Sequence, residues 1–261
     1  MPSVVVPGRF AYVHMPKTAG TYFSRALAAL GLVGTVEANA TDAIDAHSMA
    51  WQARLVANDV PIVGTIRDPW SWYFSLYHYW LDRDGLGETG HLYPYVAAVG
   101  RHRSNVIGAM VDPVGAGVKS IGSLPPPEET LRGDGMGLYT FNVLRSYCAA
   151  DWLDLDPGEA KARIDELFLL DYAIDQGRAY AGLREIVRAT GADPSPYRWR
   201  KVRALGRVLD SGWSHDAEKA CPRWLRESID KSSAAARAVL GYTGISAADH
   251  RPLTCFPRGA L

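Results

Sequence analysis

The chain has 261 residues, of which 48% are hydrophobic, and this content suits one globular domain, with or without a sizeable insertion. We therefore treat residues 1–261 as a single domain. Lysine plus arginine equals aspartate plus glutamate at 28 each, so the zero net charge gives no case for nucleic-acid or anionic-membrane binding, and any anion site must be local.

The first strong pattern is a short apolar stretch, residues 10–14, followed by a tight loop and a helix. The helix over residues 22–30 places Phe23, Ala26, Leu27 and Leu30 on one face, and Gly31 stands where a helix commonly ends. This order predicts a buried strand that feeds directly into a helix N-terminus.

The loop between them has the composition of an anion site. The first amides of a helix have no intrahelical partner, and the helix dipole adds partial positive charge there. Lys17 contributes a full charge, Thr18 and Thr21 contribute hydroxyl donors, and Gly20 is expected to let a ligand approach the backbone closely. These residues predict a site for phosphate or a similar group.

The loop is not a Walker A loop, because its lysine precedes the glycine instead of following a glycine run. Its order resembles the 5′-phosphosulfate loop of sulfotransferases that use 3′-phosphoadenosine 5′-phosphosulfate (PAPS). The resemblance implies that the cofactor contacts are made by one continuous segment: Pro16, Lys17, Thr18, Ala19, Gly20, Thr21 and Tyr22.

A second pattern follows residues 60–66, a continuous apolar run that predicts a strand buried on both faces of a parallel sheet. Asp68 is a good N-cap and Pro69 suits the first position of the next helix. Ser71, Ser75 and His78 fall on one face of that helix. Arg67, at the strand end, and Ser75 are therefore expected to reach one anion together.

Arg67, Ser75 and the aromatic residues after them resemble the 3′-phosphate motif of sulfotransferases. The resemblance covers residues 9–83, with both motifs in the order of the family. It implies an α/β fold with a central parallel sheet flanked by helices, of the P-loop NTPase-like sulfotransferase type. It also implies PAPS as donor and 3′,5′-bisphosphoadenosine as product.

Residues 84–137 are rich in glycine and proline and show weak periodicity. We expect a loop-rich insertion that forms a cap over the acceptor, since sulfotransferases roof the acceptor pocket after the second motif. The alternative is a plain surface insertion.

Regular structure is predicted again in the last part of the chain. We expect helices over residues 138–151, 159–167, 176–190 and 222–240, and the last parallel strand at residues 167–170. Residues 197–207 form the one basic cluster. By the resemblance, Arg200, Lys201 and Arg203 close over the nucleotide, and the alternative is a solvated basic turn.

The cysteines Cys148, Cys221 and Cys255 form neither a metal-ligand pattern nor a disulfide framework. The first residues lack the features of a signal peptide, and no stretch approaches the ~18 apolar residues of a membrane span. We expect a cytoplasmic protein with reduced thiols and without a membrane or nucleic-acid partner. A homo-oligomer stays open.

The resemblance implies in-line sulfuryl transfer to a hydroxyl of a carbohydrate or of a glycosylated or aromatic small molecule. Lys17 would stabilise charge on the leaving oxygen, and no metal is needed. His47 is the predicted base because several carbohydrate sulfotransferases place a catalytic histidine there. His78 is the reserve candidate, and Glu37 or Asp42 are further alternatives.

Two other functions stay open at this point. One is a nucleotide or small-molecule kinase of the P-loop type, for which Asp68 would have to hold magnesium. The other is a protein that binds a nucleotide without turning it over.

Overall fold

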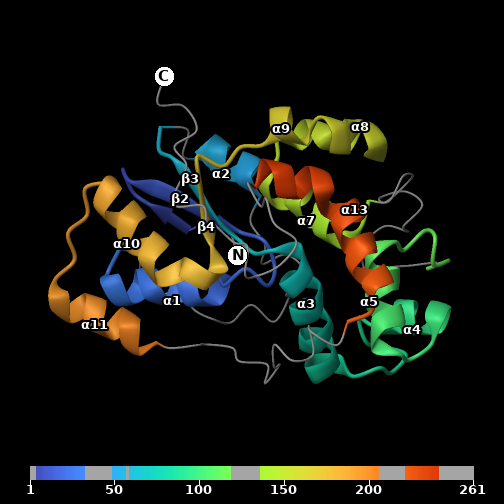
Figure 1. Ribbon diagram of the computed structural model, residues 1–261. Coiled ribbons are helices and arrows are strands. Elements are labelled where there is room, and N and C mark those ends of the chain that lie inside the picture. Colours follow the sequence, from blue (N-terminus) through green and yellow to red (C-terminus); the bar gives the residue numbers. More distant parts are fainter. Residues whose placement is uncertain (1–3, 33–48, 57–58, 119–135, 206–220, 241–261) are drawn as a thin grey trace.

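The computed structural model describes residues 4–32, 49–56, 59–118, 136–205 and 221–240. These residues form an α/β structure in which helices flank a four-stranded sheet of order β1-β2-β3-β4 (Figure 1). β2, β3 and β4 run parallel, and β1 pairs antiparallel with β2 at one edge. The parallel sheet flanked by helices confirms the predicted α/β class. The strands are β1 Val4–Val6, β2 Phe10–His14, β3 Ile62–Ile66 and β4 Tyr172–Asp175.

The register of the central strands gives the sheet two buried faces. Ala11 of β2 pairs with Ile62 of β3, and both contact the larger hydrophobic core. The next pair, Tyr12 and Val63, faces a smaller core on the opposite side. Alternate residues thus enter different cores, which explains why both strands read as continuous apolar runs.

The smaller core is covered by three helices: α1 Gly20–Leu30, α10 Ala179–Ala189 and α11 Pro196–Ala204. In Figure 1 they lie together on one side of the sheet. α1 ends as predicted at Gly31, which has φ 69° and donates its amide to the carbonyls of Leu27 and Ala28. Leu183, Ile186 and Val187 form the buried face of α10, again as the spacing predicts.

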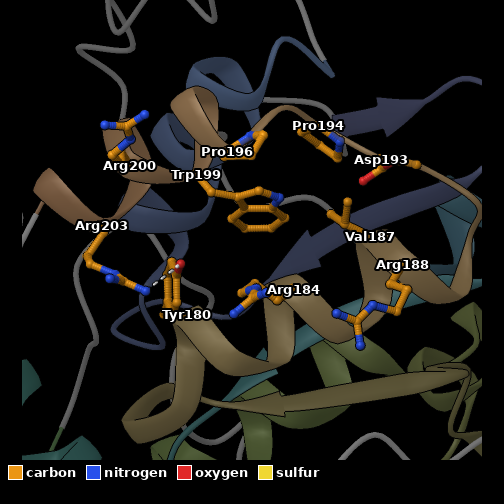
Figure 2. A pocket seen from close by; sticks show the side chains of 11 residues that line it. Tyr180, Arg184, Val187, Arg188, Asp193, Pro194, Pro196, Trp199, Arg200 and Arg203 are labelled. Atoms are coloured by element: carbon orange, nitrogen blue, oxygen red, sulfur yellow. Dashed lines mark hydrogen bonds between the residues drawn. The ribbon is translucent and has the colours of Figure 1, made fainter.

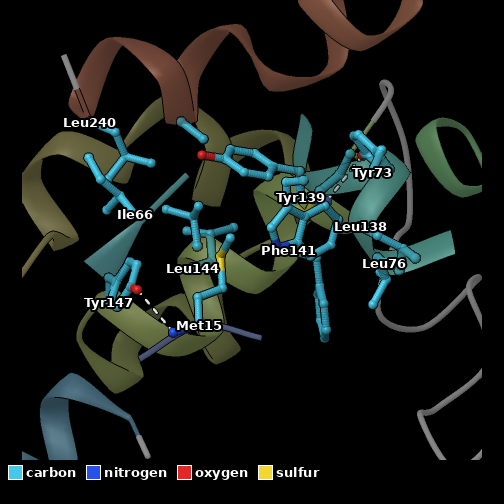
Figure 3. Close-up of a cluster of buried hydrophobic side chains, with 14 of the residues drawn as sticks. Met15, Ile66, Tyr73, Leu76, Leu138, Tyr139, Phe141, Leu144, Tyr147 and Leu240 are labelled. Carbon is cyan, nitrogen blue, oxygen red and sulfur yellow. Dashed lines mark hydrogen bonds between the residues drawn. The ribbon is translucent and has the colours of Figure 1, made fainter. Parts of the chain in front are cut away.

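The larger core lies on the other side, where Tyr139, Leu144 and Tyr147 pack with Met15 and Ile66 (Figure 3). Four longer helices surround it: α3 Pro69–Asp84, α5 Arg103–Val111, α7 Leu138–Tyr147 and α13 Arg223–Val239. The shorter elements are α2 Ala50–Val56, α4 Tyr93–Val99, η1 Ala150–Asp154, α8 Pro157–Ala162, α9 Ile164–Leu167 and η2 Gln176–Arg178.

The start of α3 follows the predicted capping chemistry. Asp68 has an extended backbone, and its carboxylate accepts from the amides of Trp70 and Ser71 at 3.0 and 3.1 Å. Pro69 occupies the first helical position, where its missing N–H costs nothing. The cap fixes α3 directly at the carboxyl end of β3.

The predicted last strand at residues 167–170 is wrong. Leu167 ends α9, and the strand β4 begins at Tyr172. The apolar run is instead tied to the end of α7, where the Leu169 amide donates to the Tyr147 carbonyl at 2.8 Å. Burial against a helix and burial in a sheet give the same apolar pattern, so the sequence did not separate them.

The loop-rich character expected for residues 84–137 is also wrong for part of that segment. α4 and α5 lie within it, and α5 buries Val106, Ile107 and Met110. Gly108 packs closely on the Trp224 ring of α13, so this glycine serves helix packing and not a turn. Residues 119–135 lie outside the described ranges.

Across the helices that the structure describes, none combines the length and the apolar character needed to cross a membrane.

Candidate functional site

The Lys17 loop, residues 15–19, connects the carboxyl end of β2 to α1. Arg67 follows the carboxyl end of β3, the neighbouring parallel strand. Parallel strands bring their carboxyl ends to one edge of the sheet, which is where open α/β sheets bind ligands. The fold thus brings the two sequence motifs together.

The loop backbone has an uncommon shape. Lys17 and Ala19 have left-handed conformations, with φ of 65° and 72°, whereas the intervening Thr18 does not. A left-handed conformation costs a residue other than glycine on the order of 1–3 kcal/mol, and such residues are concentrated at functional sites. Alternating signs of φ turn successive amides toward one side, a concavity that binds anions.

The same concavity continues into the first turn of α1. Ala19 is its N-cap and supplies no side-chain acceptor for the first amides of the helix. Unlike α3, this helix therefore presents its amides to whatever occupies the loop.

Buried hydrogen bonds hold the loop in this shape. The Met15 amide donates to the Tyr147 hydroxyl at 2.9 Å, and the Trp72 indole donates to the Pro16 carbonyl at 2.7 Å. The hydroxyl of Thr18 donates to the Met15 carbonyl at 2.7 Å and lies 3.0 Å from that of Thr65. Thr18 is fully buried, so its hydroxyl stabilises the loop and is not the ligand donor that the sequence predicted.

The Lys17 side chain is half-buried beside α3. Its Nζ lies 4.0 Å from the ring centroid of Tyr79, a cation–π contact. Burial and then the charge of Arg67 lower the pKa of Lys17, which Asp82 opposes, and the net result is a fall from 10.5 to about 8. A lysine held this way is still largely charged at neutral pH, and an anion that binds next to it stabilises the charged form.

Arg67 links the second motif to the first. Its Nη1 donates to the Lys17 carbonyl at 3.3 Å, and its Nε donates to the Ser71 hydroxyl at 3.0 Å. Tyr139 donates to the Arg67 carbonyl at 2.7 Å and fixes the backbone. Ser71 is thus a serine of this site, and the predicted Ser75 is buried one turn further along the same face of α3.

The start of α1 assigns different roles to the remaining loop residues. A β-carbon at Gly20 would lie 2.1 Å from the His14 ring, so this glycine admits His14 where we expected a ligand. Burial lowers the pKa of His14 to about 4, which leaves it neutral and structural. Thr21 is exposed and Tyr22 is half-buried, so both are accessible at the helix N-terminus.

His47, the predicted base, and its alternatives Glu37 and Asp42 lie outside the described residues. His78 is half-buried on α3. Burial and then the charge of Arg103 lower its pKa, and Asp82 acts the other way. The lowered pKa keeps His78 neutral at physiological pH.

The basic cluster forms helix α11, which packs on α1. Arg200 and Arg203 line a pocket between α10 and α11 (Figure 2). Lys201 is exposed, and its Nζ lies 4.8 Å from the ring centroid of Tyr197. Within the described part of the chain, no hydrogen bond, ion pair or ring contact joins these three side chains to the Lys17 loop. Their contact with a nucleotide stays a prediction.

Sequence reasoning missed Tyr79, Ser71 and Tyr147 as parts of this site. Tyr79 was visible in principle, because it follows Ser71 and Ser75 at steps of four along the same helical face. Tyr147 left no such signal, since it reaches the loop from a distant helix. Within the described ranges, no group of three or more His, Cys, Asp or Glu side chains could hold a metal ion.

Comparison with protein-family models, with curated proteins and with solved structures finds no match to this chain.

Proposed function

We propose that this protein is a PAPS-dependent sulfotransferase with a P-loop-type sulfotransferase fold. It would transfer the sulfuryl group to a hydroxyl of a carbohydrate or of a glycosylated or aromatic small molecule. The observation that carries the proposal is the bond from Arg67 Nη1 to the Lys17 carbonyl, 3.3 Å across 50 positions of sequence. It joins the two motifs whose resemblance suggested the family.

The residues present fit a nucleotide with two separate anionic ends. The left-handed turns at Lys17 and Ala19 and the first amides of α1 suit one anion. The guanidinium of Arg67, next to Ser71, suits a second, and Ser75 one turn further along α3 is a proposed additional donor. PAPS would supply a sulfuryl group attached to a phosphate that leaves readily. The chain itself supplies charge and orientation, and no metal is part of the proposal.

Lys17 is the proposed catalytic cation. Tyr79 positions its ammonium group, and partial burial strengthens its interaction with a developing negative charge. Removing one such donor commonly costs on the order of 10² to 10³ in rate. His47 remains the proposed base, and His78 of α3 is the alternative.

The kinase alternative finds less support. It requires an acid at a strand end that is free to hold magnesium, and both carboxylate oxygens of Asp68 accept amides of α3. The third candidate, a protein that binds the nucleotide without turnover, differs from the first only in rate.

The test is thermal stability in the presence of nucleotides. We expect 3′,5′-bisphosphoadenosine to stabilise the wild type by about 2.7 kcal/mol at a hundred times its dissociation constant. Arg67→Ala should abolish this gain. Arg101→Ala, which removes an exposed arginine, is the matched control and should retain it.

Equal or greater stabilisation by ATP with magnesium would favour the kinase and refute the role of Arg67. Transfer of labelled sulfate from PAPS to a panel of hydroxyl acceptors then separates an enzyme from a binding protein. If the protein binds the bisphosphate but neither transfers sulfate from PAPS nor hydrolyses PAPS, only the binding-protein alternative is left.

A further inference from the structure

A pocket of about 360 Å³ lies between α10 and α11. The pocket is lined by one face of α10, by one face of α11 and by the segment that connects the two helices. Figure 2 shows Trp199 of α11 above Arg184 and Tyr180 of α10, with Arg188 and Asp193 toward one end. This volume is within the range of small-molecule sites, about 300–1,000 Å³.

The lining carries a strong local positive charge. Four arginines line the pocket, against one acid, Asp193. Among the described residues, no ion pair engages any of the four: Arg184, Arg188, Arg200 and Arg203. Arginines grouped in this way can hold an anion through bidentate guanidinium contacts, although the chain as a whole has zero net charge.

An aromatic surface accompanies the charge. Trp199 meets Tyr180 edge to face, with ring centroids 5.9 Å apart. The guanidinium of Arg184 lies 5.7 Å from the Trp199 ring centroid, and that of Arg203 lies 5.5 Å from the Tyr180 ring. Rings with cations arranged around them favour a ligand that has a flat or sugar ring carrying negative groups.

Most of the pocket is remote from the Lys17 loop. Arg198 at the start of α11 donates to the carbonyl of Leu30, at the far end of α1 from the loop. Arg9, which precedes β2, donates to the carbonyl of Thr190 beside the Asp193 end of the pocket. The Tyr180 end is the part nearer to the first turn of α1, where burial and then Tyr180 raise the pKa of Tyr22.

We infer that the pocket is a second ligand site, separate from the Lys17 loop. Its ligand is a small polyanion built on a ring, with two or more phosphate or sulfate groups. The ring lies against Trp199, and the anionic groups pair with Arg184 and Arg188 at one end and with Arg203 at the other. Sulfated sugars and nucleotides share this chemistry.

The test is calorimetric titration with a trisulfated disaccharide, with ADP, with inorganic sulfate and with adenosine. We expect one-to-one saturable binding of one of the two charged ring compounds, and which one binds identifies the source. Sulfate alone and the neutral nucleoside should bind at least about tenfold more weakly, because each lacks one half of the recognition.

Arg184→Gln/Arg188→Gln should weaken the binding by about tenfold or more. Both side chains are exposed, so the variant should fold, which its melting temperature will show. Arg101→Gln/Lys231→Gln removes the same charge from exposed sites elsewhere and should leave the affinity unchanged. A ligand-induced change in tryptophan fluorescence should disappear in Trp199→Phe.

Three results would overturn the inference. The first is the absence of saturable binding by the wild type. The second is equal weakening in both double variants, which would show an effect of net charge alone. The third is loss of binding in Lys17→Met with retention in Arg184→Gln/Arg188→Gln, which would assign the ligand to the Lys17 loop.

Discussion

At the scale of single residues, Lys17 titrates near physiological pH. Its pKa of about 8 means that the free protein loses this charge as the pH rises through that value. A bound anion favours the protonated form and moves the transition upward. We therefore expect the affinity for 3′,5′-bisphosphoadenosine to fall by roughly tenfold between pH 7 and pH 10.5.

Lys17→Arg is the control, because arginine stays charged over this range and should flatten the profile. The free protein gives an independent measurement. The unfolded chain holds the Lys17 proton up to about pH 10.5 and the folded chain only to about 8. Between these values the free energy of unfolding should rise with pH, relative to Lys17→Met. A profile that Lys17→Arg leaves unchanged would assign the titration to another group.

Gly20 makes a second residue-scale prediction. Gly20→Ala places a β-carbon 2.1 Å from the His14 ring, and we expect overpacking to cost about 1–3 kcal/mol of unfolding free energy. Adding His14→Ala should recover part of this loss, so the two effects will not add. Gly87→Ala, where no atom lies within 4 Å, should be nearly neutral in the same urea denaturation experiment. Additive effects of Gly20→Ala and His14→Ala would contradict the contact.

At the scale of elements, Tyr147 connects α7 to the Lys17 loop. Its hydroxyl accepts from the Met15 amide (Figure 3) and also donates to the Thr65 carbonyl. Tyr147→Phe removes the acceptor of the buried Met15 amide and one donor to the Thr65 carbonyl, and we expect a loss of about 1–3 kcal/mol.

Tyr95→Phe is the matched control for Tyr147→Phe. Tyr95 is equally buried, but its hydroxyl finds no partner among the described residues. Its removal should be neutral or stabilising. Similar losses in both variants, measured by chemical denaturation, would show that the hydrogen bonds of Tyr147 contribute nothing specific.

The N-cap of α3 is a further prediction at this scale. Asp68→Ala removes the acceptor for two amides and should lower stability by about 0.5–2 kcal/mol. Asp68→Asn keeps an acceptor and should retain most of the stability. Because Arg67 precedes the cap, we also expect Asp68→Ala to weaken bisphosphate binding. Stability lost without any change in binding would separate the cap from the site.

The sequence predicted those elements that have local signals. α1 and α3 follow from the spacing of apolar residues and from Gly31, Asp68 and Pro69, which act on their immediate neighbours. The last strand was predicted too early in the chain, because the apolar run before β4 is buried by α7 and not in the sheet. The pairing of Arg67 with Ser71 instead of Ser75 depends on side-chain reach, which spacing alone does not determine.

At the scale of the whole molecule, zero net charge conceals two separate positive regions. One is the Lys17 and Arg67 region at the carboxyl edge of the sheet, and the other is the α10–α11 pocket. The first was predictable because each motif follows a strand of a parallel sheet. The second was not, because Arg184 and Arg188 come from one helix and Trp199 from another, and only packing brings them together.

The two cores on opposite faces of the sheet have a consequence for motion. Met15 belongs to the larger core and Phe23 to the smaller one, so the Lys17 loop bridges them. Separate cores commonly open as separate cooperative units with different free energies, which amide hydrogen exchange resolves. A ligand on this loop would couple the two units. Its binding should slow exchange in α10 and α7 together, although neither helix belongs to the loop.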